Sequence, residues 1–83
     1  DYHSFIRKAV VTEMRKTTTF ISELLEQGIK GGEFRPDIKP GDLALLFFCS
    51  IEGAIVVSRV SSSDSAMKLV VSHCKSIVEQ ICI

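Results

Sequence analysis

The sequence has no excess of charge of either sign, since its ten basic residues are matched by ten acidic residues spread along the chain without blocks. Proteins that bind the phosphate backbone of nucleic acid normally carry a basic patch or stripe. The balanced charge therefore indicates that this chain alone does not bind nucleic acid.

Patterns typical of metal sites and catalysis are also missing. His3 and His73 lie far apart, and the three cysteines lack the paired spacing of a zinc site or a redox motif. No glycine-rich loop or strained serine turn is present to form a phosphate or oxyanion site. We therefore expect no enzyme, no metal and no cofactor. Cys49, Cys74 and Cys82 lie in apolar stretches, which predicts buried free thiols in a cytoplasmic protein.

Uninterrupted hydrophobic runs are limited to one segment. The first apolar residues are interleaved with charged ones, which argues against a signal peptide. Residues 43–60 approach the length of a membrane span. However, Glu52 lies at the middle of this run and Arg59 near its end, and a charge at the bilayer centre costs about 2.5 to 3.5 kcal/mol on insertion scales. We therefore expect a buried helix here and no contact with a membrane.

Hydrophobic residues recur in steps of three and four, and the alternation typical of strands is absent. This pattern predicts helices over residues 3–30, 40–60 and 64–81. Gly31 and Gly32 are expected to end the first helix, because glycine adopts the left-handed conformation of a helix C-cap without a steric penalty.

The segment between the first two predicted helices is expected to be an ordered connector. Pro36 and Pro40 both disfavour a helical conformation in the residue before them. Phe34 and Ile38 are expected to anchor the connector to the core. Pro40 suits the first position of the second helix, where Asp42 complements the helix dipole.

The length of 83 residues allows only one small core, and a domain of this size buries about 60% of the surface that its unfolded chain exposes. The hydrophobic fraction of 46% is high for such a chain, so part of it is expected to face a second subunit. We expect residues 1–83 to form a single all-α domain.

Two features resemble the TetR family of transcriptional regulators. Residues 24–37 resemble the part of that family in which a long helix closes with a glycine, a glutamate and an apolar residue. The pair Glu52 and Gly53, followed by Arg59, a short polar break and a last helix, is similar to the family's C-terminal helices. The chain departs from the family where Pro40 opens the second helix without an acidic residue directly before it.

The resemblance implies the ligand-sensing and dimerisation region of a bacterial TetR-type transcriptional repressor. A helix-turn-helix domain on the N-terminal side would then supply DNA binding, and a small-molecule effector would modulate it. We expect the first two helices to line part of the effector pocket with seven residues: Met14, Thr17, Thr18, Ile21, Phe47, Phe48 and Ile51.

The second and third helices are expected to pack against their two-fold copies as a four-helix-bundle homodimer. The predicted interface residues are Cys49, Glu52, Gly53, Val56, Val57, Val70, Cys74, Ile77, Val78 and Ile81. Glu52 allows two interpretations, as an interface or core acid with a hydrogen-bonding partner or as a polar contact in the effector pocket. The alternative hypothesis for the whole chain is a helical protein-protein interaction or adaptor domain without a ligand.

Overall fold

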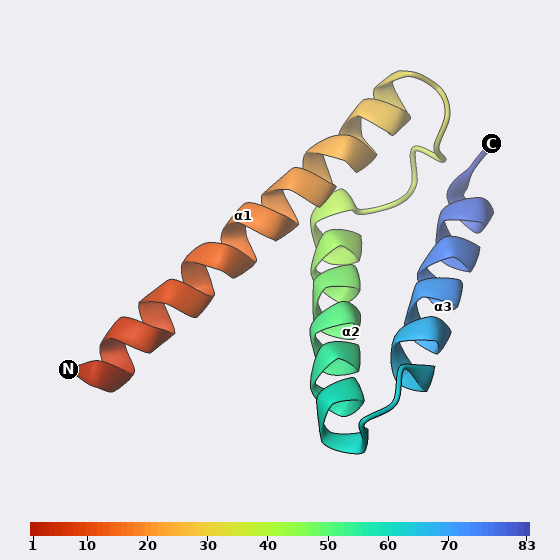
Figure 1. Cartoon of the computed structure of the whole chain (residues 1–83). Coiled ribbons are helices and arrows are strands. Elements are labelled where there is room, and N and C mark those ends of the chain that lie inside the picture. Colours follow the sequence, from red (N-terminus) through yellow and green to blue (C-terminus); the bar gives the residue numbers. More distant parts are fainter.

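A computed structural model describes all 83 residues and contains three α-helices and no strands (Figure 1). Helix α1 spans Tyr2–Lys30, α2 spans Pro40–Ser61 and α3 spans Ser65–Ile81. The predicted all-α fold is confirmed, and each predicted helix end lies within a residue or so of the observed one.

The ends of α1 follow from its flanking residues. At the start, the Asp1 carboxylate accepts a hydrogen bond from the backbone N–H of Ser4 at 2.7 Å, which satisfies one free amide of the first turn. At the other end, Gly31 keeps a helical φ of −79°, whereas Gly32 has a φ of +75°. Gly32 is therefore the residue that takes the left-handed cap conformation.

Helix α2 begins as the sequence predicts and ends in an unusual way. Pro40 is its first residue, and Asp42 lies in its first turn. After its last turn, Ser62 adopts a left-handed conformation with a φ of 53° and donates its backbone N–H to the carbonyl of Ser58. This serine turn reverses the chain into α3 within three residues.

The three helices lie side by side in one curved layer with α2 in the middle (Figure 1). Helix α1 packs against α2, and α2 packs against α3, but α1 and α3 do not pack against each other. The Cα trace measures 45 × 32 × 13 Å. Helix α1 also diverges from α2 toward its own N-terminus, so the pair forms a V that is open where α1 begins and α2 ends (Figure 1).

The closed end of the V is held by a short antiparallel bridge between the connector and the C-terminus. Arg35 donates its backbone N–H to the carbonyl of Ile81 at 2.8 Å, and Ile83 donates to the carbonyl of Glu33 at 3.0 Å. We call residues 33–35 together with residues 81–83 the C-terminal clasp. It joins the end of α1 to the end of α3.

A single layer of helices buries little of its surface. Only six residues are buried, namely Leu25, Gly28, Ala44, Phe47, Ala54 and Ile81. The accessible surface of 6278 Å² is about 1,300 Å² above the roughly 4,900 Å² typical of a folded monomer of this mass. The radius of gyration of 14.9 Å likewise exceeds the value of about 12 Å expected for a compact domain.

The expectation that residues 43–60 form a buried helix is therefore wrong for the isolated chain. Helices α1 and α3 both pack against the same half of the α2 surface, and most of the surface of α2 is exposed. By length and composition alone it could cross a membrane. Because stable domains normally pack two layers around a core, the exposed side of α2 lacks the layer that would cover it.

Candidate functional site

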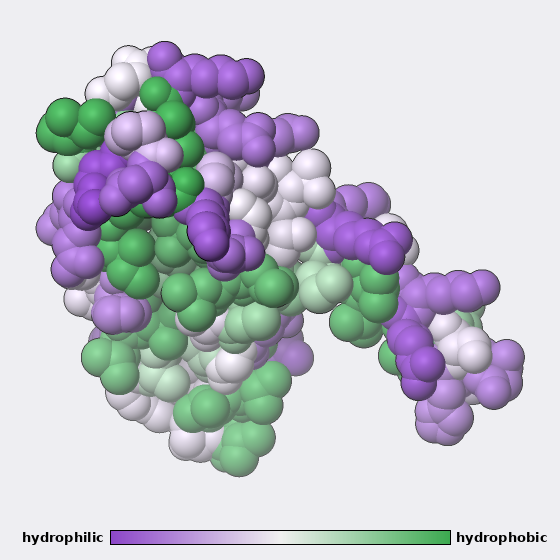
Figure 2. All heavy atoms as spheres, turned by 180° about the vertical axis from the view of Figure 1, so that it is seen from behind, coloured by the Kyte–Doolittle hydropathy of each residue, from purple (hydrophilic) through white to green (hydrophobic).

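One continuous apolar stripe runs along the exposed side of α2. Its members recur in steps of three and four, which places them on one helix face, and they are Leu46, Cys49, Gly53, Val56, Val57 and Val60. Val60 is 83% exposed, Val56 is 60% exposed and Leu46 is 53% exposed. We call these six residues the α2 stripe. Hydrophobic side chains gather over α2 and α3 in the view from behind (Figure 2).

Gly53 lies at the middle of the α2 stripe, and its lack of a side chain leaves room for another helix to approach closely. A Cβ atom built at Gly53 would meet no atom within 4 Å, so nothing in its own chain fills the space beside it. Small residues at such a position allow the backbone of another helix to approach closely. The stripe therefore has the shape of a helix-packing surface without a partner helix.

The predicted interface residues divide between two environments. Those on α2, namely Cys49, Glu52, Gly53, Val56 and Val57, are all exposed. Those on α3 face their own chain instead: Val70, Cys74, Ile77 and Val78 are half-buried, and Ile81 is 7% exposed. The α2 part of the predicted interface is thus available to a partner in full, and the α3 part only along its edges.

Several exposed apolar residues of α2 and α3 lie outside the predicted interface. Leu46 and Val60 extend the α2 stripe at both ends, and Leu69 and Val71 of α3 are 72% and 53% exposed. The spacing did carry a signal for the first two, because Leu46 precedes Cys49 by three positions and Val60 follows Val56 by four. Leu69 and Val71 do not lie on the apolar face that the helical spacing of α3 predicts, so the spacing gave no signal for them.

The two acids of the open V form a second feature. Glu13 of α1 and Glu52 of α2 line one hollow of about 440 Å³ together with Ala9, Val10, Thr17 and Phe48. Glu52 is exposed and forms no ion pair, whereas Glu13 pairs weakly with Lys16 at 3.8 Å. We call this space the acidic hollow. Of the two interpretations of Glu52, a core acid does not fit its exposure.

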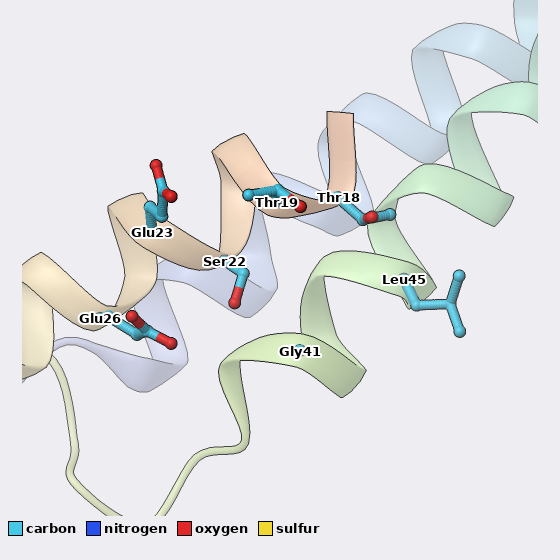
Figure 3. Close-up of a pocket in the computed structure, with 7 residues that line it drawn as sticks. All are labelled: Thr18, Thr19, Ser22, Glu23, Glu26, Gly41 and Leu45. Atoms are coloured by element: carbon cyan, nitrogen blue, oxygen red, sulfur yellow. The ribbon is translucent and has the colours of Figure 1, made fainter. Parts of the chain in front are cut away.

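A polar hollow of about 420 Å³ lies between the second half of α1 and the first turns of α2. Figure 3 shows Ser22 and Glu26 of α1 reaching toward the first turn of α2 at Gly41, whereas Glu23 points away. Thr18, Thr19 and Leu45 complete its lining. Carboxylates and hydroxyls make this hollow hydrophilic, so it does not have the mostly apolar walls typical of small-molecule sites.

An apolar hollow of about 460 Å³ lies at the closed end of the V. Helices α1, α2 and α3 and the connector all contribute to it, and its lining residues are Ile21, Leu24, Leu25, Gln27, Gly28, Glu33, Phe34, Phe47 and Val78. All three hollows are open to solvent in the isolated chain.

The seven predicted pocket residues are spread over these three hollows. Thr17 and Phe48 line the acidic hollow, Thr18 lines the polar hollow, and Ile21 and Phe47 line the apolar hollow. Met14 and Ile51 are half-buried and line none of the three. The predicted residues therefore follow the α1–α2 groove as a whole and do not meet in one cavity of this chain.

The cysteines are free, but the expectation that all three are buried is wrong. Cys49 and Cys82 are exposed, and Cys74 is half-buried. Cys49 lies on the uncovered side of α2, and Cys82 follows the last residue of α3, so neither is enclosed by a second layer.

Comparisons with known proteins agree with this architecture. The family model of the tetracyclin repressor-like C-terminal domain matches residues 1–74. No curated protein sequence matches the chain. Among solved structures, the crystal structure of the TetR-family transcriptional regulator from Cytophaga hutchinsonii matches with a TM-score of 0.90 at 23% identity. The match covers 100% of this chain and 42% of that one.

Proposed function

Because the chain belongs to the tetracyclin repressor-like C-terminal domain family, we propose that it is the dimerisation and effector-sensing region of a bacterial TetR-type transcriptional regulator. The observation that carries this proposal is the exposed α2 stripe, because a contiguous apolar face of this kind marks a site of interaction with another protein surface. We place the regulator in the cytoplasm, where free exposed thiols such as Cys82 stay reduced.

In this proposal a second copy of the chain covers the α2 stripe. Under a two-fold axis the same face serves both subunits, and α2 and α3 of each chain form a four-helix bundle with their copies. A standard interface buries about 800 Å² on each partner, which the chain's surplus of accessible surface can supply. Exposed Arg59 and Lys75 are suited to its polar rim.

The effector site is proposed to be the α1–α2 groove. Five of the seven predicted pocket residues line its hollows, and the acidic hollow combines the Phe48 ring with the carboxylates of Glu13 and Glu52. Sites for small molecules typically combine apolar walls with a few polar groups that orient the ligand. In this proposal, an effector that binds one width of the groove more tightly shifts the population of dimer conformations and weakens operator binding.

DNA binding is assigned to a helix-turn-helix domain on the N-terminal side of residue 1. The chain has no net charge and no basic cluster, so residues 1–83 are not expected to hold DNA by themselves. This chain corresponds to 42% of the structurally similar regulator, which leaves room in such a protein for a reading domain.

A gel-shift titration against the gene's own promoter tests the proposal. We expect the gene's complete product to bind tightly and with a strong dependence on salt, because contacts with phosphates release counterions. The 83-residue chain, used as the control, is expected to give no shift. Salt-sensitive binding by the 83-residue chain alone would show that its own surface reads DNA, which would contradict the assignment to an N-terminal domain. A complete product without DNA affinity would favour the adaptor alternative.

A further inference from the structure

The closed end of the V is much more tightly fixed than its open end. Gly28 is buried, and Leu25 is only 4% exposed, whereas every residue from 1 to 10 is exposed. Helix α1 has 29 residues and is therefore about 43 Å long, so a rotation of about 5° at the closed end displaces its start by about 4 Å. The position of α1 relative to α2 depends on what holds this end.

The side chain of Phe34 locks the closed end from the connector side. Its ring lies against Gly28 so closely that a Cβ atom added at Gly28 would clash with ring carbon Cδ2. The backbone N–H groups of Glu33 and Phe34 both donate to the carbonyl of Gly28, at 2.8 and 3.1 Å. The connector is thus bound to the last turns of α1 by a ring contact and two hydrogen bonds.

The same short segment is bound to α3 by the C-terminal clasp. Neighbouring Arg35 donates to the carbonyl of Ile81, and Ile83 donates back to Glu33. Ile81 is itself buried, and Phe34 and Val78 line the same hollow. Since α1 and α3 do not pack against each other, this segment is the direct connection between them.

We propose that the Phe34–Gly28 contact and the C-terminal clasp together form the pivot of α1, which sets how wide the α1–α2 groove opens. This inference rests on the proposed function in one respect, because the width that it explains is that of the proposed effector groove. When the pivot is intact, α1 samples a narrow range of angles to α2. When it is broken, the open end of the V samples a wider range.

The pivot can be tested by measuring the distance across the open end with double electron–electron resonance. Spin labels at Arg7→Cys and Ser61→Cys report on the start of α1 and the end of α2, and both positions are exposed. The background carries Cys49→Ser, Cys74→Ala and Cys82→Ser, and excess unlabelled chain suppresses signals between subunits. Neither DNA nor effector is needed, so the result is independent of the gel-shift test.

Two variants break the pivot in different ways. Phe34→Ala removes the ring, whereas Gly28→Ala expels the ring while improving the helix propensity of α1. We expect both to broaden the distance distribution and to accelerate hydrogen exchange of the Arg35 and Ile83 amides by about tenfold or more. The matched control is Phe20→Ala, which removes a phenyl group that is 62% exposed on α1, and it should change neither measurement.

Two results would overturn the pivot. In the first, the clasp amides exchange faster in both variants, but the distance distribution keeps its width, which would mean that α2 alone fixes α1. In the second, Phe20→Ala broadens the distribution as much as Phe34→Ala, which would mean that any loss of apolar surface loosens the chain.

Discussion

At the scale of single residues, the small side chains at the helix contacts decide how closely the helices approach. Ala44 in the second turn of α2 is 0% exposed, and Ala54 is 4% exposed. Closely packed interiors have few voids, so a position of this kind has no room for additional methylene groups. The small size of Ala44 is therefore as important to the fold as the large side chains around it.

Replacing Ala44 with leucine tests this packing. We expect Ala44→Leu to lower the free energy of unfolding by about 1 to 3 kcal/mol, the usual cost of overpacking a filled site. Urea denaturation followed by circular dichroism at one protein concentration gives the value. Ala9→Leu, at an exposed position of α1, is the control and should stay close to the parent. Equal stability of the two variants would show that the site around Ala44 can expand freely.

At the scale of secondary-structure elements, each helix ends where a particular residue adopts an allowed turn. Gly32 ends α1 at a φ of +75°, a conformation that costs glycine little. Ser62 performs the same role after α2 at a φ of 53°, although a Cβ atom makes this conformation unfavourable. The turn between α2 and α3 is therefore a place where the sequence is not optimal for the structure.

Ser62→Gly should therefore stabilise the chain. We expect the free energy of unfolding to rise by about 0.5 to 1 kcal/mol, because the strain of the left-handed serine exceeds the entropy that glycine loses on folding. Ser61→Gly is the control with the opposite sign, since Ser61 lies within α2 and glycine disfavours helix. Thermal unfolding of both variants decides the matter, and a loss of stability in Ser62→Gly would contradict this account of the turn.

The elements were predictable from sequence because their signals are local. Helical spacing, the glycine pair after Lys30 and the prolines of the connector each act within a few residues, and the structure places the helices where these signals lie. The ring contact between Phe34 and Gly28 and the bridge between Arg35 and Ile81 carry no such signal. They depend on the arrangement of the helices in space, which a single sequence does not show.

The burial of each apolar residue was only partly predictable for the same reason. The hydrophobic content of α2 indicated coverage on more than one side, and the chain covers only the side that carries Ala44, Phe47 and Ala54. The spacing of α3 predicted its apolar face, and Ile77 and Ile81 on that face share a hollow with Leu43 and Leu46 of α2. The sequence predicted that α1 and α2 together line the effector pocket, but it did not predict that the space between them divides into three hollows.

At the scale of the whole molecule, we propose that the curved layer is half of a larger structure. Its surface is larger than a monomer of this mass needs, and the α2 stripe is exposed. In the proposed dimer, a second copy of the chain supplies the missing layer with the same residues, because a two-fold interface is self-complementary. This dimer is the central claim, since the proposed response to an effector depends on two subunits that move relative to each other.

Size-exclusion chromatography with light scattering on Gly53→Leu tests the dimer most directly. A side chain at Gly53 meets nothing within 4 Å in its own chain, and leucine is the better helix former, so the single chain should fold at least as well as the parent. Across a close two-fold interface the same leucine should cost about 1 to 3 kcal/mol at each of two symmetric sites. Gly41→Leu is the control, because Gly41 is also unobstructed but faces the polar hollow.

We expect twice the mass of one chain for the parent and for Gly41→Leu, and a shift toward monomer or aggregate for Gly53→Leu. A parent that stays monomeric and well folded at high concentration, or a Gly53→Leu variant that remains fully dimeric, would contradict it.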